Sequence, residues 1–186
     1  MQIIEEPLPG CFLLEPRILT DQRGYFFESF NAKVFSTLTG ITRSFVQDNQ
    51  SYSSYGVIRG LHAQAGIHAQ AKLVRVMQGA VLDVALDLRA DSPTLGKWFG
   101  TVLSAENKRQ LYIPRGFAHG FAVLSPFAEF FYKCDAYYHQ AAEYGVHYAD
   151  SDLNIDWQIP LEQRILAEKD QQLPPLKKVL QSNNMR

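Results

Sequence analysis

The 186-residue sequence lacks the features that mark secreted, membrane-spanning and nucleic-acid-binding proteins. It has only two cysteines, Cys11 and Cys134, which form no CxxC pair. We expect two free thiols in a reducing compartment, and a single disulfide is the alternative. No apolar run approaches the ~20 residues that cross a bilayer, and the first residues do not resemble a signal peptide. The formal net charge of −1 predicts neither a nucleic-acid nor a membrane partner. The missing signal peptide and membrane span lead us to expect a cytoplasmic protein.

Helix-forming segments are also scarce. Asn31 is placed to cap a short helix over residues 32–38 that Gly40 ends, and residues 161–170 have room for one or two turns. From about residue 174 the tail is polar, and we expect it to be loose. No repeat or change of composition divides the chain, so we expect a single domain over residues 1–186.

Strand signals dominate the rest of the chain. Aromatic residues make up 12% of the sequence, and aromatic side chains favour strands. Residues 82–89 alternate apolar and polar positions, which predicts a half-buried strand, and residues 72–77 and 129–134 also predict strands. Turn residues recur between these runs. The pattern predicts an all-β sandwich or barrel with a few short helices.

Histidines are the first candidates for a metal site. The segment Pro114-Arg115-Gly116-Phe117-Ala118-His119 has the P-x-G-x-x-H spacing of the second motif of metal-binding cupins. The first motif needs a His-x-His pair before the Lys72 strand, and this chain has His62-Ala63-Gln64 there. One ligand of a three-histidine site is therefore missing, so we expect no metal and no other cofactor. What remains is a barrel shaped to hold a ligand.

Four side chains form a complete set for removing a proton beside a carbonyl group. His62 is the candidate base, Asp170 its orienting partner, Lys72 the electrophile and Tyr132 the acid. Each also has a structural alternative, such as a satisfied histidine, a packed tyrosine or an exposed carboxylate. On a regular strand Arg59 and His62 lie on opposite faces. The positive charge of Arg59 beside Gly60 and His62 suits an anionic ligand that approaches the backbone.

The order and spacing of several long motifs resemble those of the dTDP-4-dehydrorhamnose 3,5-epimerase family. The resemblance extends from about residue 9 to residue 170. The segments that carry it are residues 47–51, 59–62, 68–76, 83–89, 103–107, 113–121 and 168–170.

The resemblance implies a cupin-type jelly-roll barrel, a homodimer, no metal, and an isomerase acting on a dTDP-4-dehydro-6-deoxyhexose. It gives His62, Asp170, Lys72 and Tyr132 the four catalytic roles named above. It also implies that the substrate is bound by Arg23, Phe26 and Glu28 across the dimer, by Tyr138 stacking on thymine, and by Gln47, Asn49, Arg59, His119, Glu143 and either Glu168 or Lys169.

Two departures from the family pattern are visible. Ala63 stands where the family usually has tyrosine, and Glu168 stands where it usually has lysine, with Lys169 following. Strand alternation predicts that Ala63 points away from the face that carries His62. The family activity inverts both C3 and C5 of the sugar. The alternatives are an epimerase of one carbon, a ketoisomerase, or a cupin that binds a sugar nucleotide without catalysis.

Overall fold

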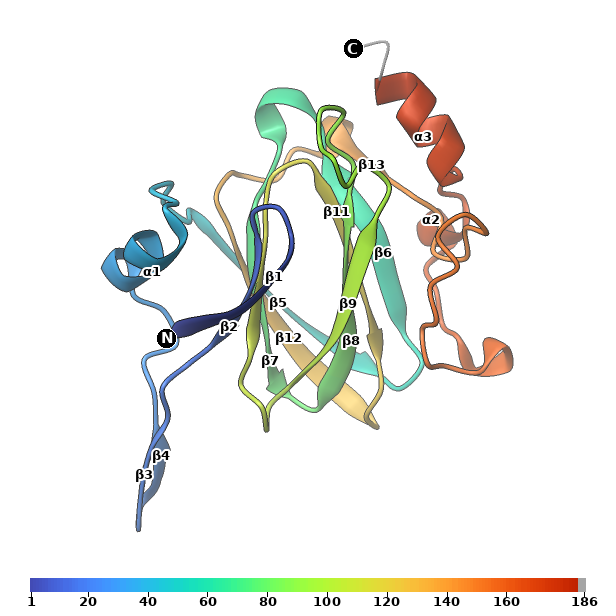
Figure 1. Cartoon of the computed structure of the whole chain (residues 1–186). Helices are drawn as coiled ribbons and strands as arrows, with labels where there is room; N and C mark the ends of the chain where they lie inside the picture. Colours follow the sequence, from blue (N-terminus) through green and yellow to red (C-terminus); the bar gives the residue numbers. More distant parts are fainter. Residues whose placement is uncertain (184–186) are drawn as a thin grey trace.

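Two antiparallel sheets face each other in the computed structural model, which describes residues 1–183 (Figure 1). The six-stranded sheet has the order β1 (Gln2–Leu8), β2 (Cys11–Glu15), β10 (Gln110–Ile113), β7 (Lys72–Gln78), β12 (Phe127–Cys134) and β5 (Gln47–Ser54). The five-stranded sheet has the order β13 (Glu143–Gly145), β6 (Ile58–Gln64), β11 (Phe117–Val123), β8 (Ala80–Asp87) and β9 (Trp98–Ser104). The prediction of an all-β jelly-roll barrel with a few short helices is confirmed.

Three apolar clusters hold the layers together. The first fills the barrel between the sheets and includes Val74 from one sheet and Phe121 from the other. The second lies outside the five-stranded sheet, where Trp157 and neighbouring residues of the C-terminal segment cover it. The third lies outside the six-stranded sheet, where Phe35 of the first helix packs on Leu73. Burial of these side chains, at roughly 25 cal/mol per Å² of apolar area, is the main stabilising term.

Short helices flank the barrel. They are α1 (Ala32–Thr39), α2 (Glu168–Gln171) and α3 (Leu176–Asn183), with 3₁₀ turns at Gly66–His68, Gln140–Ala142 and Leu161–Gln163. The predicted caps of α1 are confirmed: the Asn31 side chain accepts hydrogen bonds from two backbone N–H groups, and Gly40 is left-handed with φ 74°. Within residues 1–183 no helix is long and apolar enough to span a bilayer. Both cysteines are buried free thiols, as predicted.

The expectation of a loose tail from about residue 174 is wrong over the described residues. The chain forms α3 there, and Leu176 and Val179 are buried against the second cluster. Their spacing of three residues puts both on one face of the helix. The Asp150 carboxylate also accepts a hydrogen bond from the backbone N–H of Leu176 at 2.8 Å. These few apolar residues in a polar segment are enough to dock it.

Strand β8 is buried on both faces, so the prediction of a half-buried strand is wrong. Leu82, Val84 and Leu86 pack in the outer cluster, as the alternation suggested. The other face looks into the barrel, where Asp83 and Asp87 are both 0% exposed. Polar residues on a strand therefore mark the barrel interior in this protein, and each carboxylate needs partners there.

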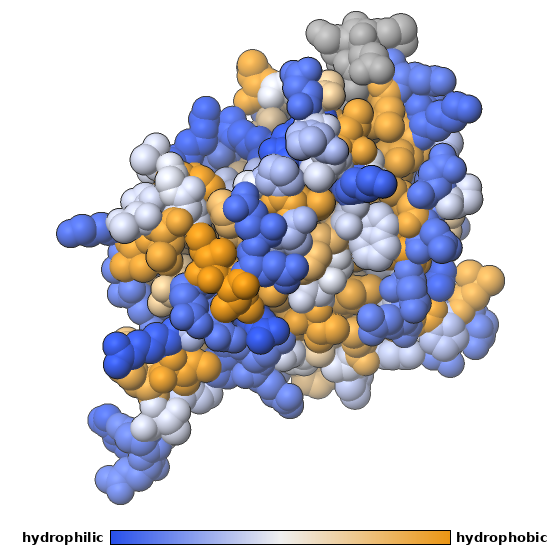
Figure 2. Space-filling view, in the orientation of Figure 1, coloured by the Kyte–Doolittle hydropathy of each residue, from blue (hydrophilic) through white to orange (hydrophobic). Residues whose placement is uncertain are grey.

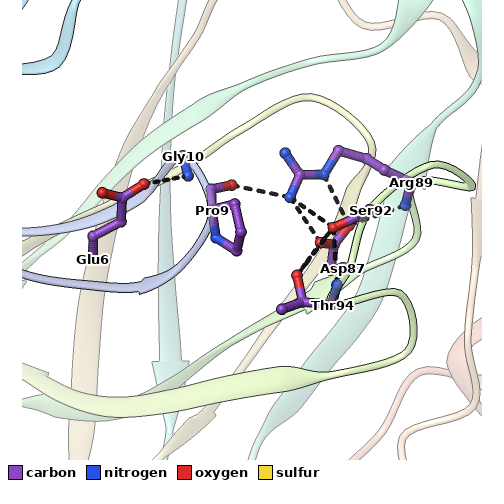
Figure 3. A network of polar contacts seen from close by, with 7 residues as sticks. All are labelled: Glu6, Pro9, Gly10, Asp87, Arg89, Ser92 and Thr94. Carbon is purple, nitrogen blue, oxygen red and sulfur yellow. Dashed lines mark hydrogen bonds and ion pairs between the residues drawn. The ribbon is translucent and has the colours of Figure 1, made fainter.

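Asp87 finds those partners in the turn that follows β8 (Figure 3). Its carboxylate accepts hydrogen bonds from the Arg89 guanidinium and from the hydroxyls of Ser92 and Thr94. Arg89 also donates to the Pro9 carbonyl at 2.9 Å, which ties the β1–β2 turn to this network. Burial alone would raise the pKa of Asp87, but the hydrogen bonds lower it to about 2.

We predict that this network makes stability depend on acid pH. Because the folded pKa of Asp87 lies below the unfolded value, its contribution is present above about pH 4 and is lost as pH falls through about 2. It amounts to at most about 2 kcal/mol, reduced by solvent around the partly exposed Arg89. Urea unfolding between pH 7 and pH 2 should show Asp87→Asn destabilised at neutral pH and less sensitive to acid. The exposed Asp91→Asn is the control; matching curves for both variants would contradict the account.

A third element, the hairpin of β3 (Leu19–Asp21) and β4 (Gly24–Phe26), projects away from the barrel (Figure 1). Its tip is hydrophilic and the surface next to it is hydrophobic (Figure 2). Phe26 is 69% exposed, and Leu19 and Tyr25 are also exposed. Several exposed apolar side chains on one projection are typical of a contact surface.

Candidate active site

One pocket of about 630 Å³ lies between the two sheets and gathers most of the predicted site residues. All four candidate catalytic residues line it: His62 from β6, Lys72 from β7, Tyr132 from β12 and Asp170 from α2. The predicted binding residues that also line it are Asn49, Arg59, His119, Tyr138, Glu143 and Lys169. Gln47 lines the adjoining hollow, which shares His62, Lys72 and Tyr132 with this pocket.

A hydrogen bond joins the partly exposed His62 to the buried Asp170. The His62 Nε2 atom lies 2.7 Å from Asp170 Oδ1, and Asp170 is only 2% exposed. The other carboxylate oxygen accepts the backbone N–H of Gly60 at 3.2 Å. Burial would raise the pKa of Asp170, but its hydrogen bonds to His62 and Gly60 and the nearby charge of Lys169 lower it below its ordinary value. An ionised Asp170 holds the proton of neutral His62 on Nε2, which leaves Nδ1 as the basic nitrogen.

Lys72 brings a positive charge into the pocket wall. Its ammonium lies 5.7 Å from the centre of the Tyr132 ring. It makes no hydrogen bond or ion pair with any residue from 1 to 183. Burial lowers the pKa of Lys72, and the neighbouring Cys134, Asp83 and Glu143 raise it. A cation without a fixed partner is available to an oxyanion.

Tyr132 keeps its proton. Burial raises the pKa of Tyr132 to about 12, with Cys134 and Glu143 adding to the shift and Arg59 opposing it. The phenol is therefore a hydrogen-bond donor and an acid at neutral pH.

Arg59 lies in the same pocket as His62, so the prediction that the two occupy opposite faces is wrong. Regular alternation breaks at Gly60, whose φ is +111° and whose peptide bond to Leu61 is cis. Leu61 then packs outward, and Arg59 donates to Ser53 on β5 at 3.1 Å. As predicted, Ala63 points away from the base and packs in the outer cluster.

The mouth of the pocket holds a polar chain. The Tyr138 hydroxyl donates to Glu143 at 2.9 Å, and Lys169 donates to the other oxygen of Glu143 at 3.3 Å. Gln47 accepts the backbone N–H of Tyr138 at 3.0 Å. Glu168 is exposed, bonds to Gln172, and is absent from the pocket lining, so Lys169 is the member of that pair that lines the pocket.

Three predicted binding residues lie elsewhere. Arg23 and Phe26 are on the projecting hairpin and line a separate hollow there. Glu28 follows the hairpin and accepts a hydrogen bond from Asn31. The chain therefore does not bring these residues to its own pocket.

Asp83 is the residue that sequence reasoning missed. It lies behind His119 and accepts a hydrogen bond from the histidine Nε2 at 2.9 Å. The alternation of β8 suggested that it faces solvent, whereas it faces the barrel interior. The available signal was an isolated pair of carboxylates, Asp83 and Asp87, in a strand that is otherwise apolar.

Metal ligands do not converge in the described part of the chain. Within residues 1–183 no group of three His, Cys, Asp or Glu side chains is arranged to hold an ion. That the protein works without a metal stays a prediction.

Comparison with known proteins gives one consistent family. The family model described as dTDP-4-dehydrorhamnose 3,5-epimerase matches residues 5–178. A protein of that name from Shigella flexneri is 51% identical over 170 residues, covering 91% of this chain and 93% of that protein. The crystal structure of the Elizabethkingia anophelis NUHP1 protein of that name has 56% identity and a TM-score of 0.93, covering 96% of this chain and 97% of that one. A Legionella pneumophila dTDP-6-deoxy-D-glucose-3,5-epimerase in complex with dTDP-4-keto-L-rhamnose has 51% identity and a TM-score of 0.91, covering 95% and 93%.

Close contact between β6 and β11 places His62 opposite His119, and we predict that it depends on Gly120. A Cβ atom on Gly120 would lie 2.7 Å from the backbone oxygen of Arg59, so the strands would have to separate. Gly120→Ala should lower the free energy of unfolding by about 1–3 kcal/mol in urea titrations.

The control for that experiment is Gly100→Ala. There the added Cβ would lie 3.1 Å from a side-chain carbon of Trp98, so a few tenths of an ångström of side-chain movement relieve the contact and no backbone has to separate. Equal losses of stability in the two variants would show that the contact at Gly120 has no special role.

Proposed function

The chain belongs to the dTDP-4-dehydrorhamnose 3,5-epimerase family, and we propose that it inverts C3 and C5 of dTDP-4-dehydro-6-deoxy-D-glucose to give dTDP-4-dehydro-L-rhamnose. It is an isomerase of the cupin type. The observation that carries the proposal is the pocket in which His62, held by Asp170, faces Lys72 and Tyr132. A protein that only binds a sugar nucleotide needs no such acid–base set.

Proton removal is the first step. The C4 ketone acidifies the protons on the neighbouring carbons C3 and C5. His62 takes one of them through Nδ1, because Asp170 holds its other ring nitrogen as the N–H donor. The bond between carbon and hydrogen breaks, and its electron pair moves into an enolate whose charge lies on the C4 oxygen. A positioned base of this kind contributes on the order of 10²–10⁴-fold.

Lys72 stabilises the enolate. Its ammonium stands in the pocket wall without an ion-pair partner in the described chain, so the developing oxyanion becomes that partner. Burial strengthens the attraction, since water does not screen it.

Tyr132 returns a proton from the opposite face of the ring. Its raised pKa, about 12, keeps the phenol protonated until the enolate accepts the proton. Return from the face opposite to His62 inverts the carbon. His62 then releases its proton to solvent and Tyr132 regains one from solvent, and repetition at the second carbon completes the reaction.

The nucleotide part of the substrate is bound around the pocket mouth. Arg59 has no ion-pair partner within residues 1–183, and a guanidinium matches the oxygens of a diphosphate. The half-exposed Tyr138 ring offers a stacking surface for thymine. Gln47, Asn49, His119, Glu143 and Lys169 supply the further polar contacts. The Legionella relative in complex with dTDP-4-keto-L-rhamnose supports this class of ligand.

A homodimer would complete the site. Arg23, Phe26 and Glu28 lie away from their own pocket, on or beside the projecting hairpin. In a dimer that exchanges hairpins, they reach the nucleotide in the partner subunit. The exposed apolar residues of the hairpin support this arrangement, as they would become buried. We further infer a cytoplasmic location, which the two free thiols support.

We predict that His62→Ala abolishes exchange of solvent deuterium at both sugar carbons. The variant should still bind dTDP, because the base does not hold the nucleotide. NMR of the sugar nucleotide in deuterated water measures exchange, and calorimetry measures binding. Asp170→Asn should impair exchange less completely, since it disturbs the tautomer rather than removing the base. Exchange at the wild-type rate in His62→Ala would remove His62 from the mechanism.

Tyr132→Phe separates proton removal from proton return. This variant keeps the ring but loses the hydroxyl proton, so His62 still forms the enolate, which is then reprotonated from the original face. Recovered substrate should contain deuterium while inverted product falls by at least about tenfold. A wild-type yield of inverted product would contradict the assignment of Tyr132.

A further inference from the structure

Asp83 is a buried carboxylate that does not stabilise the fold in the usual way. It is 0% exposed, and its Oδ1 atom is the only buried side-chain oxygen or nitrogen in the described chain without a hydrogen-bond partner. Its other oxygen accepts one hydrogen bond, from His119 Nε2 at 2.9 Å. A buried carboxylate that is half unpaired weakens a fold.

Asp87, two alternations further along the same strand face, shows what a stabilising carboxylate looks like. It is equally buried, but it is bonded by Arg89, Ser92 and Thr94. Asp83 has only the histidine. The charge of Asp87 therefore stabilises a turn of the fold, whereas the only hydrogen-bond partner of the Asp83 carboxylate is His119, a residue of the pocket.

Ring stacking, strand pairing and a hydrogen bond through Nε2 hold His119 in place. Its ring stacks on Phe130 at 5.8 Å between centroids, and its backbone lies opposite His62 in the pairing of β6 with β11. Nε2 is bonded to Asp83, and His119 lines the pocket. The remaining ring nitrogen, Nδ1, is therefore the one available to a ligand.

We propose that Asp83 is a positioning residue that holds His119 in the Nε2–H tautomer, so that Nδ1 faces the sugar as a hydrogen-bond acceptor. The ligand group it receives is then a donor, which in this substrate class means a sugar hydroxyl. Burial, helped by the charge of Lys72, lowers the pKa of His119 although Asp83 opposes the shift, which keeps the ring neutral and its Nδ1 lone pair free. The choice of a hydroxyl on the sugar rests on the proposed function; the tautomer does not.

The charge of Asp83 also acts on Lys72. The ionisable groups around Lys72 are Cys134 and Tyr132 of β12, His119 of β11, Glu143 of β13 and Asp83 of β8. Burial lowers the pKa of Lys72, while Asp83, Cys134 and Glu143 raise it. Asp83 thus helps Lys72 to remain charged when an enolate forms. Loss of its charge would lower the pKa of Lys72 further.

The first test does not depend on activity. Nitrogen-15 NMR of the histidine rings in the full-length protein at neutral pH should show His119 protonated on Nε2 and bare on Nδ1, with His119→Gln used for assignment. In Asp83→Leu, which has no acceptor, this preference should disappear. A wild-type His119 that carries its proton on Nδ1, or on both nitrogens, overturns the proposal.

The second test compares Asp83→Asn with Asp87→Asn for unfolding temperature and for kcat/KM against pH. Asp83→Asn should unfold at the wild-type temperature or above, because it removes a poorly paired charge. Its kcat/KM should fall by about 10–100-fold, as when a carboxylate behind a functional histidine is removed, and the alkaline limb should move to lower pH. Asp87→Asn should unfold earlier with unchanged kinetics.

Lower stability with wild-type kinetics and an unchanged pH profile in Asp83→Asn would give Asp83 a purely structural role and overturn the proposal. If the wild-type protein fails to convert dTDP-4-dehydro-6-deoxy-glucose, the proposed function fails instead. In that case, and also if Asp83→Asn does not fold, the wild-type NMR result still decides the tautomer.

Discussion

The hydrogen bond between His62 and Asp170 is the contact on which the rest of the site depends. It joins a strand of the barrel wall to a four-residue helix more than a hundred positions later in the chain. Asp170 reaches that position because Trp157, Ile159 and α3 pack the C-terminal segment onto the outside of the five-stranded sheet. The segment is therefore part of the candidate active site, although it lies outside the barrel. Its apolar contacts hold Asp170 where it orients the His62 ring.

The interior of the barrel combines an apolar half with a charged half. The apolar cluster supplies stability, whereas Lys72 and Asp83 place charges with few partners inside the barrel, next to the neutral ring of His119. Such charges weaken the fold and strengthen every electrostatic interaction with a ligand. Proton abstraction beside a ketone needs this environment, because the enolate forms only if its charge is stabilised.

Much of the fold could be predicted from local pattern. The strands β7, β8 and β12, the α1 caps and the outward direction of Ala63 follow from periodicity and capping, which act over a few residues. The prediction for Arg59 was wrong because the backbone at Gly60 breaks the alternation of strand faces. A break at one residue leaves no periodic pattern in the sequence. The prediction that Asp83 faces solvent was wrong because the same alternating sequence pattern arises when the polar face of a strand lines a barrel interior. The prediction of a loose tail was wrong because Leu176 and Val179 are buried by contacts with residues distant in the sequence, which the local pattern does not show. The candidate set of His62, Lys72, Tyr132 and Asp170, to which the family motifs give roles, lies in one pocket of the structure.

The most direct test of the central claim is to count the deuterons that the wild-type protein places in the sugar. The protein is incubated with dTDP-4-dehydro-6-deoxy-D-glucose in deuterated water, and the product is examined by NMR and mass spectrometry. We expect one deuteron at C3, one at C5, and the dTDP-4-dehydro-L-rhamnose configuration. A single deuteron would indicate an epimerase of one carbon, and conversion or binding without any deuteron would contradict proton abstraction at this site.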